Sequence, residues 1–148
     1  MRLSSTILLL IGLLLFACKQ PQIPDSSPVI VQQATPCFGA CPVYTISIYE
    51  NRVVSLKAER FVKLQGNFTA SLSQKDYERL IEKFENSVFD FKDKYTAQLT
   101  DMPTIHLTFN HKGREKKIMD YYGAPDELKN LEAEVYALID KLKWKKAR

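Results

Sequence analysis

Two cysteines separated by three residues, Cys37 and Cys41, are the residues best suited to chemistry in this chain. A thiol pair can close into a disulfide, take part in thiol redox reactions, or bind a soft metal ion such as copper through its sulfurs. A metal site would need a further ligand, for which the chain offers two histidines, His106 and His111. His106 is expected on the polar face of a strand and His111 in a turn, where histidines are commonly solvated. The expected role of the cysteine pair is therefore a structural disulfide, with metal binding and redox work as competing interpretations.

Other chemical motifs are weaker. Asp93, Asp101 and Asp120 could be pictured as paired carboxylates for acid–base catalysis, yet isolated acids more often cap turns or face solvent. The sequence contains no nucleophile elbow, no glycine-rich phosphate loop and no zinc-protease helix motif. We therefore predict no catalytic residue and no cofactor, and the pattern points away from an enzyme.

The elements that must position these residues follow from hydrophobic periodicity. In chain order the pattern predicts strands at 44–49, 54–58 and within 60–72, a helix at 73–88, strands at 104–109 and 115–122, and a helix at 125–142. Hairpins imply an antiparallel sheet, and each helix has one apolar stripe that must lie on it. We expect an α+β two-layer sandwich, with an antiparallel sheet of about 4–5 strands and two helices packed on one face, in the order ββ(β)αββα.

The amino-terminal residues have the features of a secretory signal peptide. Arg2 precedes an apolar run from Ile7 to Ala17, which is shorter than the roughly 20 residues that a membrane-spanning helix needs. The predicted organisation is a signal peptide at 1–17, a Pro-rich tether at 18–35 and a single domain at 36–148. Export would place Cys37 and Cys41 in an oxidising compartment, where a disulfide is expected.

The end of this leader, Leu15-Phe16-Ala17-Cys18, resembles the lipobox of bacterial lipoproteins. The resemblance implies that cleavage leaves Cys18 as a lipidated first residue carrying palmitate-like chains. Such chains would hold the protein on a membrane, because each buried methylene contributes about 0.8 kcal/mol. Lys19 in the next position, rather than Asp, favours the outer membrane by analogy with lipoprotein sorting. We therefore expect a lipid-anchored protein of the bacterial cell envelope, with ordinary secretion as the alternative.

The residues from Pro36 to Tyr44, Pro-Cys-Phe-Gly-Ala-Cys-Pro-Val-Tyr, resemble the opening of a bacterial family catalogued as domain of unknown function 6438. Shorter similarities follow at Phe61-Val62-Lys63 with Gly66, Asp93-Lys94-Tyr95, Asp101-Met102-Pro103-Thr104 and Tyr121-Tyr122-Gly123-Ala124-Pro125. The resemblance extends to about Leu142 and implies an exported, often lipid-anchored domain with no established activity. One departure is Glu50-Asn51-Arg52, which stands where a Gly-containing hairpin turn would be expected.

Aromatic side chains are frequent at interfaces. The candidate binding residues are Phe38, Tyr44, Asp101, Tyr121 and Tyr122. We interpret the chain as a non-catalytic binding or structural module at the cell envelope. It would contact the membrane through its lipid anchor, and an envelope protein or glycan through its exposed sheet face or the disulfide-shaped turn. A net charge of +4 is too small to indicate nucleic acid as a partner.

Cys37 and Cys41-Pro42 also resemble the copper-binding motif of exported assembly factors with a thioredoxin-like fold, in which two thiolates and a distant histidine hold the metal. The ligands here would be Cys37 and Cys41 with His106 or His111. In that fold the cysteine pair precedes a helix, whereas this sequence predicts a strand after Cys41. A thiol redox or copper-binding protein is therefore the alternative function.

Overall fold

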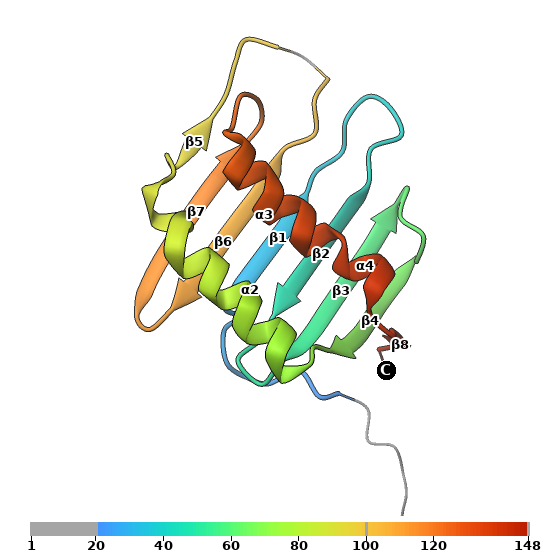
Figure 1. Ribbon diagram of the computed structural model, residues 1–148. Helices are drawn as coiled ribbons and strands as arrows, with labels where there is room; N and C mark the ends of the chain where they lie inside the picture. The colour runs from blue at the N-terminus through green and yellow to red at the C-terminus, as the bar shows by residue number, and fades with distance from the viewer. Residues whose placement is uncertain (1–20, 100, 148) are drawn as a thin grey trace, which may run out of the picture.

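The computed structural model describes residues 21–99 and 101–147. These residues form one open, mixed sheet of eight strands, and the described helices cover one face of it (Figure 1). The strand order across the sheet is β5-β7-β6-β1-β2-β3-β4-β8, and every pairing is antiparallel except the parallel pair of β5 and β7. The predicted signal peptide and Cys18 lie outside the described residues.

The elements have the following bounds. The strands are β1 (Ile30–Ala34), β2 (Val43–Ile48), β3 (Val53–Arg60), β4 (Gly66–Ser71), β5 (Lys94–Tyr95), β6 (Ile105–His111), β7 (Arg114–Asp120) and β8 (Lys145–Lys146). The helices are α2 (Gln74–Ser87), the 3₁₀ turn η2 (Val88–Asp90), α3 (Asp126–Tyr136) and the short α4 (Leu138–Lys141). The predicted α+β class is confirmed. The predicted strand count and order differ, because β1, β5 and β8 were not expected.

The strand β1 occupies the middle of the sheet, between β2 and β6. It belongs to the segment 18–35 that the sequence analysis assigned to the tether, so the folded part of the chain includes residues before Pro36. Ile30, Gln32 and Ala34 point into the core and are at most 3% exposed. Because β1 has five residues and two of them are glutamines, its pattern cannot be distinguished from that of a linker.

The other unexpected strands, β5 and β8, are two-residue edge strands. Periodicity cannot reveal an element of this length. β8 also explains why the final helix differs from the expected 125–142. Helix α3 ends at Tyr136, α4 adds one turn after Ala137, and the chain then turns so that Lys145 and Lys146 pair with β4. Short strands that carry lysine leave little open edge for unwanted pairing.

The hydrophobic core lies between the helices and one face of the sheet. Strands β1, β2, β3 and β6 send every second side chain into it, as the alternation predicts. Helix α2 contributes Leu80, Ile81 and Phe84. It begins as predicted at Ser73, whose hydroxyl accepts a hydrogen bond from the Asp76 backbone N–H at 3.1 Å. None of the described helices has the length and apolar character that crossing a membrane requires.

The opposite sheet face is mainly polar. A row of side chains runs across it from Thr108 through Val31, Ser47 and Ser55 to Thr69, as the strand registers place them. All described helices lie on the other face (Figure 1). The sheet is therefore buried mainly on the helix side, although Val53 and Thr69 of the other face are 5% and 3% exposed, and this difference accounts for the apolar and polar alternation of its sequence.

The turn between β2 and β3 is closed without glycine. The Arg52 backbone N–H donates to the Tyr49 carbonyl at 2.8 Å, and the Asn51 side-chain carbonyl accepts from the Val53 N–H at 3.1 Å. Arg52 therefore takes a left-handed conformation, with φ of 65°. A Gly-containing turn would suit this geometry, since a residue with a Cβ is strained at this position.

Replacing Arg52 by glycine should raise the free energy of unfolding by up to about 1 kcal/mol, because glycine adopts positive φ without a Cβ clash. Urea denaturation followed by circular dichroism measures the change. Arg52→Ala serves as the control, since it keeps the Cβ and should gain much less. A loss of stability in Arg52→Gly would contradict the assignment of strain to this residue.

Candidate functional site

Four loops lie at one end of the sheet, and we call them the loop edge: residues 35–42, 61–65, 96–104 without residue 100, and 121–125 (Figure 1). They come together because β1, β3, β5 and β7 end there, while β2, β4 and β6 begin there. The sequence motifs of the family resemblance fall mainly on these loops or next to them. The fold therefore gathers segments that are far apart in the chain.

The loop edge exposes large apolar side chains. Phe38, at the tip of the first loop, is 92% exposed. The other exposed large apolar side chains of these loops are Phe61, Leu99, Met102 and Tyr122. Among the described residues, only Ile23 has a comparable exposed side chain elsewhere, and it lies in the segment that leads into β1 from the opposite end. Apolar exposure is thus concentrated at one end of the domain.

The loop edge also carries little charge. Its only charged residues are Lys63 and Asp101, although charged residues make up 26% of the whole chain. Lys63 Nζ lies 3.6 Å from Asp140 Oδ1, so its charge faces a partner on α4. The centre of a protein–protein interface typically has few charged residues and many aromatic and methionine side chains.

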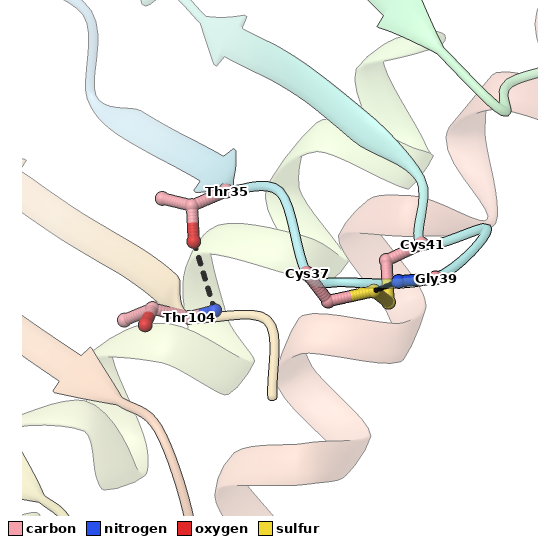
Figure 2. Close-up of a disulfide and its surroundings, with 5 residues drawn as sticks. All are labelled: Thr35, Cys37, Gly39, Cys41 and Thr104. Carbon is pink, nitrogen blue, oxygen red and sulfur yellow. Dashed lines mark hydrogen bonds between the residues drawn. A yellow bond between two sulfur atoms is a disulfide. The ribbon is translucent and has the colours of Figure 1, made fainter. Parts of the chain in front are cut away.

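A disulfide closes the first loop (Figure 2). The Cα atoms of Cys37 and Cys41 are 5.8 Å apart, within the range for a disulfide, as the sequence analysis expected. The Gly39 backbone N–H points back to Cys37 Sγ at 3.2 Å, so the three intervening residues form a tight turn. This turn holds Phe38 at its tip and away from the core.

Hydrogen bonds join the loops to one another. The Thr104 backbone N–H donates to Thr35 Oγ1 at 3.0 Å, as Figure 2 shows, and the Thr35 N–H donates to the Thr104 carbonyl at 2.9 Å. The Tyr121 hydroxyl donates to the Leu99 carbonyl at 2.6 Å. The loop 96–104 is therefore tied to the disulfide loop on one side and to the loop 121–125 on the other.

The structure brings four of the five predicted binding residues to the loop edge. Phe38 and Tyr122 are exposed, Tyr121 supports its neighbouring loop, and Asp101 is exposed with φ of 74°. Tyr44 is different, because it belongs to the inward face of β2 and is 3% exposed.

Tyr44 is held in the core rather than offered to a ligand. Its hydroxyl accepts a hydrogen bond of 2.7 Å from Gln32 Nε2, and its ring centroid lies 5.1 Å from that of Tyr136 on α3. Burial raises the pKa of the Tyr44 hydroxyl to about 12, although the hydrogen bond from Gln32 opposes this rise. Tyr44 therefore stays neutral and supports the sheet under the loop edge.

A buried polar cluster that the sequence patterns did not reveal lies around Asp120. Asp120 ends β7 and Glu132 lies on α3, and they are 1% and 5% exposed. Lys129 Nζ contacts Asp120 Oδ2 and lies 3.6 Å from Glu132 Oε2. One signal could have revealed Glu132, since it falls within the buried stripe of α3 that Leu128 and Val135 share.

The histidines do not join the cysteines. His106 is exposed on β6, and His111 ends that strand with Nδ1 2.9 Å from Glu85 Oε1 of α2. Across residues 21–99 and 101–147, no three His, Cys, Asp or Glu side chains are grouped so that they could hold a metal ion. The ligand set of the copper-binding alternative, Cys37 and Cys41 with a histidine, is thus not assembled in this part of the chain.

The fold and its loops define an α+β domain with a one-sided sheet and a disulfide-closed loop edge. Residues 28–139 match the model of a family described as a domain of unknown function, DUF6438, and the chain belongs to this family. The matched region includes β1 and all four loops. No curated protein and no solved structure gave a significant match.

The double variant Cys37→Ser/Cys41→Ser should lose at most about 2 kcal/mol of unfolding free energy, because the disulfide closes a very short loop. The sheet should keep its circular dichroism spectrum, since the disulfide lies outside the strands. Urea denaturation measures the loss, and wild-type protein treated with a reductant provides the matched comparison. Complete unfolding of the variant would show that the disulfide holds more than its own loop.

Proposed function

We propose that this protein is a lipid-anchored binding protein of the bacterial cell envelope, held through Cys18 at the outer membrane. The leader and its lipobox-like end support the anchor, and they lie in residues 1–20, outside the described structure. A cysteine pair at disulfide distance fits an oxidising compartment. Mass spectrometry of the mature amino terminus tests the anchor, because an unmodified residue other than Cys18 at that end would refute it.

The binding function rests on one observation, the concentration of exposed apolar side chains at a loop edge that is almost free of charge. Large apolar side chains that are exposed together at one end of a protein commonly mark an interaction site. The disulfide and the bonds between loops limit how far these side chains can move. A pre-organised surface loses less conformational entropy on binding, which favours affinity.

The chemistry of the loop edge favours a protein as the partner. A glycan site needs several polar side chains that converge on hydroxyl groups, whereas the exposed side chains here are mainly Phe, Leu, Met and Tyr. A surface for anionic lipid needs clustered lysine or arginine, and the loop edge contains only Lys63. An apolar patch with little charge matches the buried centre of a protein interface.

The position of the tether fits this assignment. The described chain enters β1 from the end of the sheet opposite the loop edge (Figure 1). Gln22 already bonds to Asn51 at that end, so the residues from Cys18 to Gln22 could extend only about 12 Å at about 3.1 Å per residue, and that end would lie nearest the lipid. The loop edge would then face away from the anchoring membrane, toward other envelope proteins.

Photo-crosslinking in the lipidated protein tests the binding site. A photoreactive phenylalanine analogue at position 38 should capture a specific envelope protein, and the same analogue at position 122 should capture the same partner. Placed at position 23, which is also exposed and apolar but lies outside the loop edge, beside Ser47 and Ser55 on the sheet face without helices, it should capture none. Capture of the same partner at all three positions, or of none at 38 and 122, would contradict the proposal.

With the captured partner purified, Phe38→Ser should weaken its binding roughly tenfold or more, as expected for a central interface aromatic. Ile23→Ser removes a comparable apolar side chain outside the loop edge and should leave the affinity unchanged. Binding that survives Phe38→Ser but requires free thiols, trapped as a mixed disulfide in Cys41→Ser, would instead support the thiol redox alternative.

A further inference from the structure

The buried cluster beneath the loop edge places two carboxyl groups where they share one cationic partner. Asp120 belongs to β7 and Glu132 to α3, so the pair spans the interface between sheet and helix. Lys129 reaches both carboxyl groups from one turn earlier on α3, and its side chain is about half exposed. The cluster is too well covered to receive a ligand, and it lies at the contact between α3 and the sheet.

The surroundings offer few other partners for these acids. Gln32 of β1 donates through Nε2 to the Tyr44 hydroxyl and to the Glu132 backbone carbonyl, the latter at 3.0 Å. Neither of these hydrogen bonds goes to a carboxylate. Asp120 Oδ1 and Glu132 Oε1 have no hydrogen-bond partner in the described part of the chain. One lysine therefore compensates two buried acids, and a second negative charge would be poorly balanced.

Three titratable groups face Glu132 from the elements that pack around it. They are Asp120 from β7, Tyr44 from β2 and Lys129 from α3 itself. Burial raises the pKa of the Glu132 carboxyl to about 7, the Asp120 carboxylate adds to this rise, and Lys129 opposes it. Burial lowers the pKa of the Lys129 ammonium, but Asp120 and Glu132 raise this pKa by more. Lys129 therefore stays cationic.

We propose that Asp120, Glu132 and Lys129 form a proton-dependent latch between α3 and the sheet. With one proton on the carboxyl pair, its single negative charge is balanced by Lys129 and α3 is held in place. When the proton leaves to solvent, two buried carboxylates repel each other across the interface, and the first turns of α3 separate more readily from β7. The loop 121–125 joins these two elements directly and moves with them.

The direction of the pH effect follows from the raised pKa of Glu132. The open form releases this proton near 4.5 and the closed form near 7, so the closed form binds the proton more tightly between these values. The closed form is therefore favoured most below about pH 4.5 and loses this advantage progressively up to about pH 7. Between about pH 5 and about pH 8 the opening equilibrium constant should rise roughly 50- to 100-fold.

Hydrogen exchange of the backbone amides in residues 121–131 measures this opening, after correction for the intrinsic pH dependence of exchange. The wild type should show the rise. Glu132→Gln cannot lose a proton and should show an opening constant that does not depend on pH over this range. Glu134→Gln is the matched control, because Glu134 lies on the same helix but pairs with Lys83 near the surface, and it should keep the wild-type rise.

A wild-type opening constant that does not change with pH, or the same rise in Glu132→Gln, would overturn the latch. If Glu132→Gln does not fold, carbon NMR of the Glu132 carboxyl in wild-type protein decides. A midpoint near 7 is expected, and a midpoint near 4.5 would overturn the proposal. The readouts need no partner, so the latch and the proposed binding function can fail separately.

Discussion

The pairing of β1 with β2 on one side and β6 on the other is the interaction on which the rest of the structure depends. Without β1, two units of strands would share no sheet, with β2, β3, β4 and β8 on one side and β5, β6 and β7 on the other. The unit of β6 and β7, with only the two-residue β5 beside them, would be marginally stable alone, because an isolated two-stranded hairpin is marginal at best in water. Because β1 buries Ile30, Gln32 and Ala34 under the helices, it joins these units over one core.

This central pairing also explains the geometry of the loop edge. Antiparallel neighbours on both sides of β1 bring the loops of both units to the same end of the sheet. The bonds between Thr35 and Thr104 then connect loops that belong to different units, and the bond from Tyr121 to Leu99 connects two loops within the second unit. Directly below, Gln32 of β1 links Tyr44 of β2 to the α3 backbone at Glu132. The surface proposed to bind and the buried cluster proposed to respond to pH thus share one support.

Sequence patterns were sufficient where an element has a long apolar stripe or a clear alternation. They predicted the α+β class, the helix that starts at Ser73, both hairpins and the closeness of Cys37 and Cys41. They failed for β1, whose glutamines resemble a linker, and for two-residue edge strands that have no period. Tyr44 was a candidate binding residue, although the alternation of β2 already placed it on the apolar face with Ile46 and Ile48. The pairing of Asp120 with Glu132 could not be inferred because it depends on long-range packing.

Native-state hydrogen exchange of the β1 amides tests most directly whether this strand unites the domain. If it does, the amides of residues 30–34 that bond to β2 and β6 exchange only through global unfolding, as slowly as the most protected amides of those two strands. Exchange of the 30–34 amides at the rate of an unstructured linker, while β2 and β6 remain protected, would contradict the central place of β1.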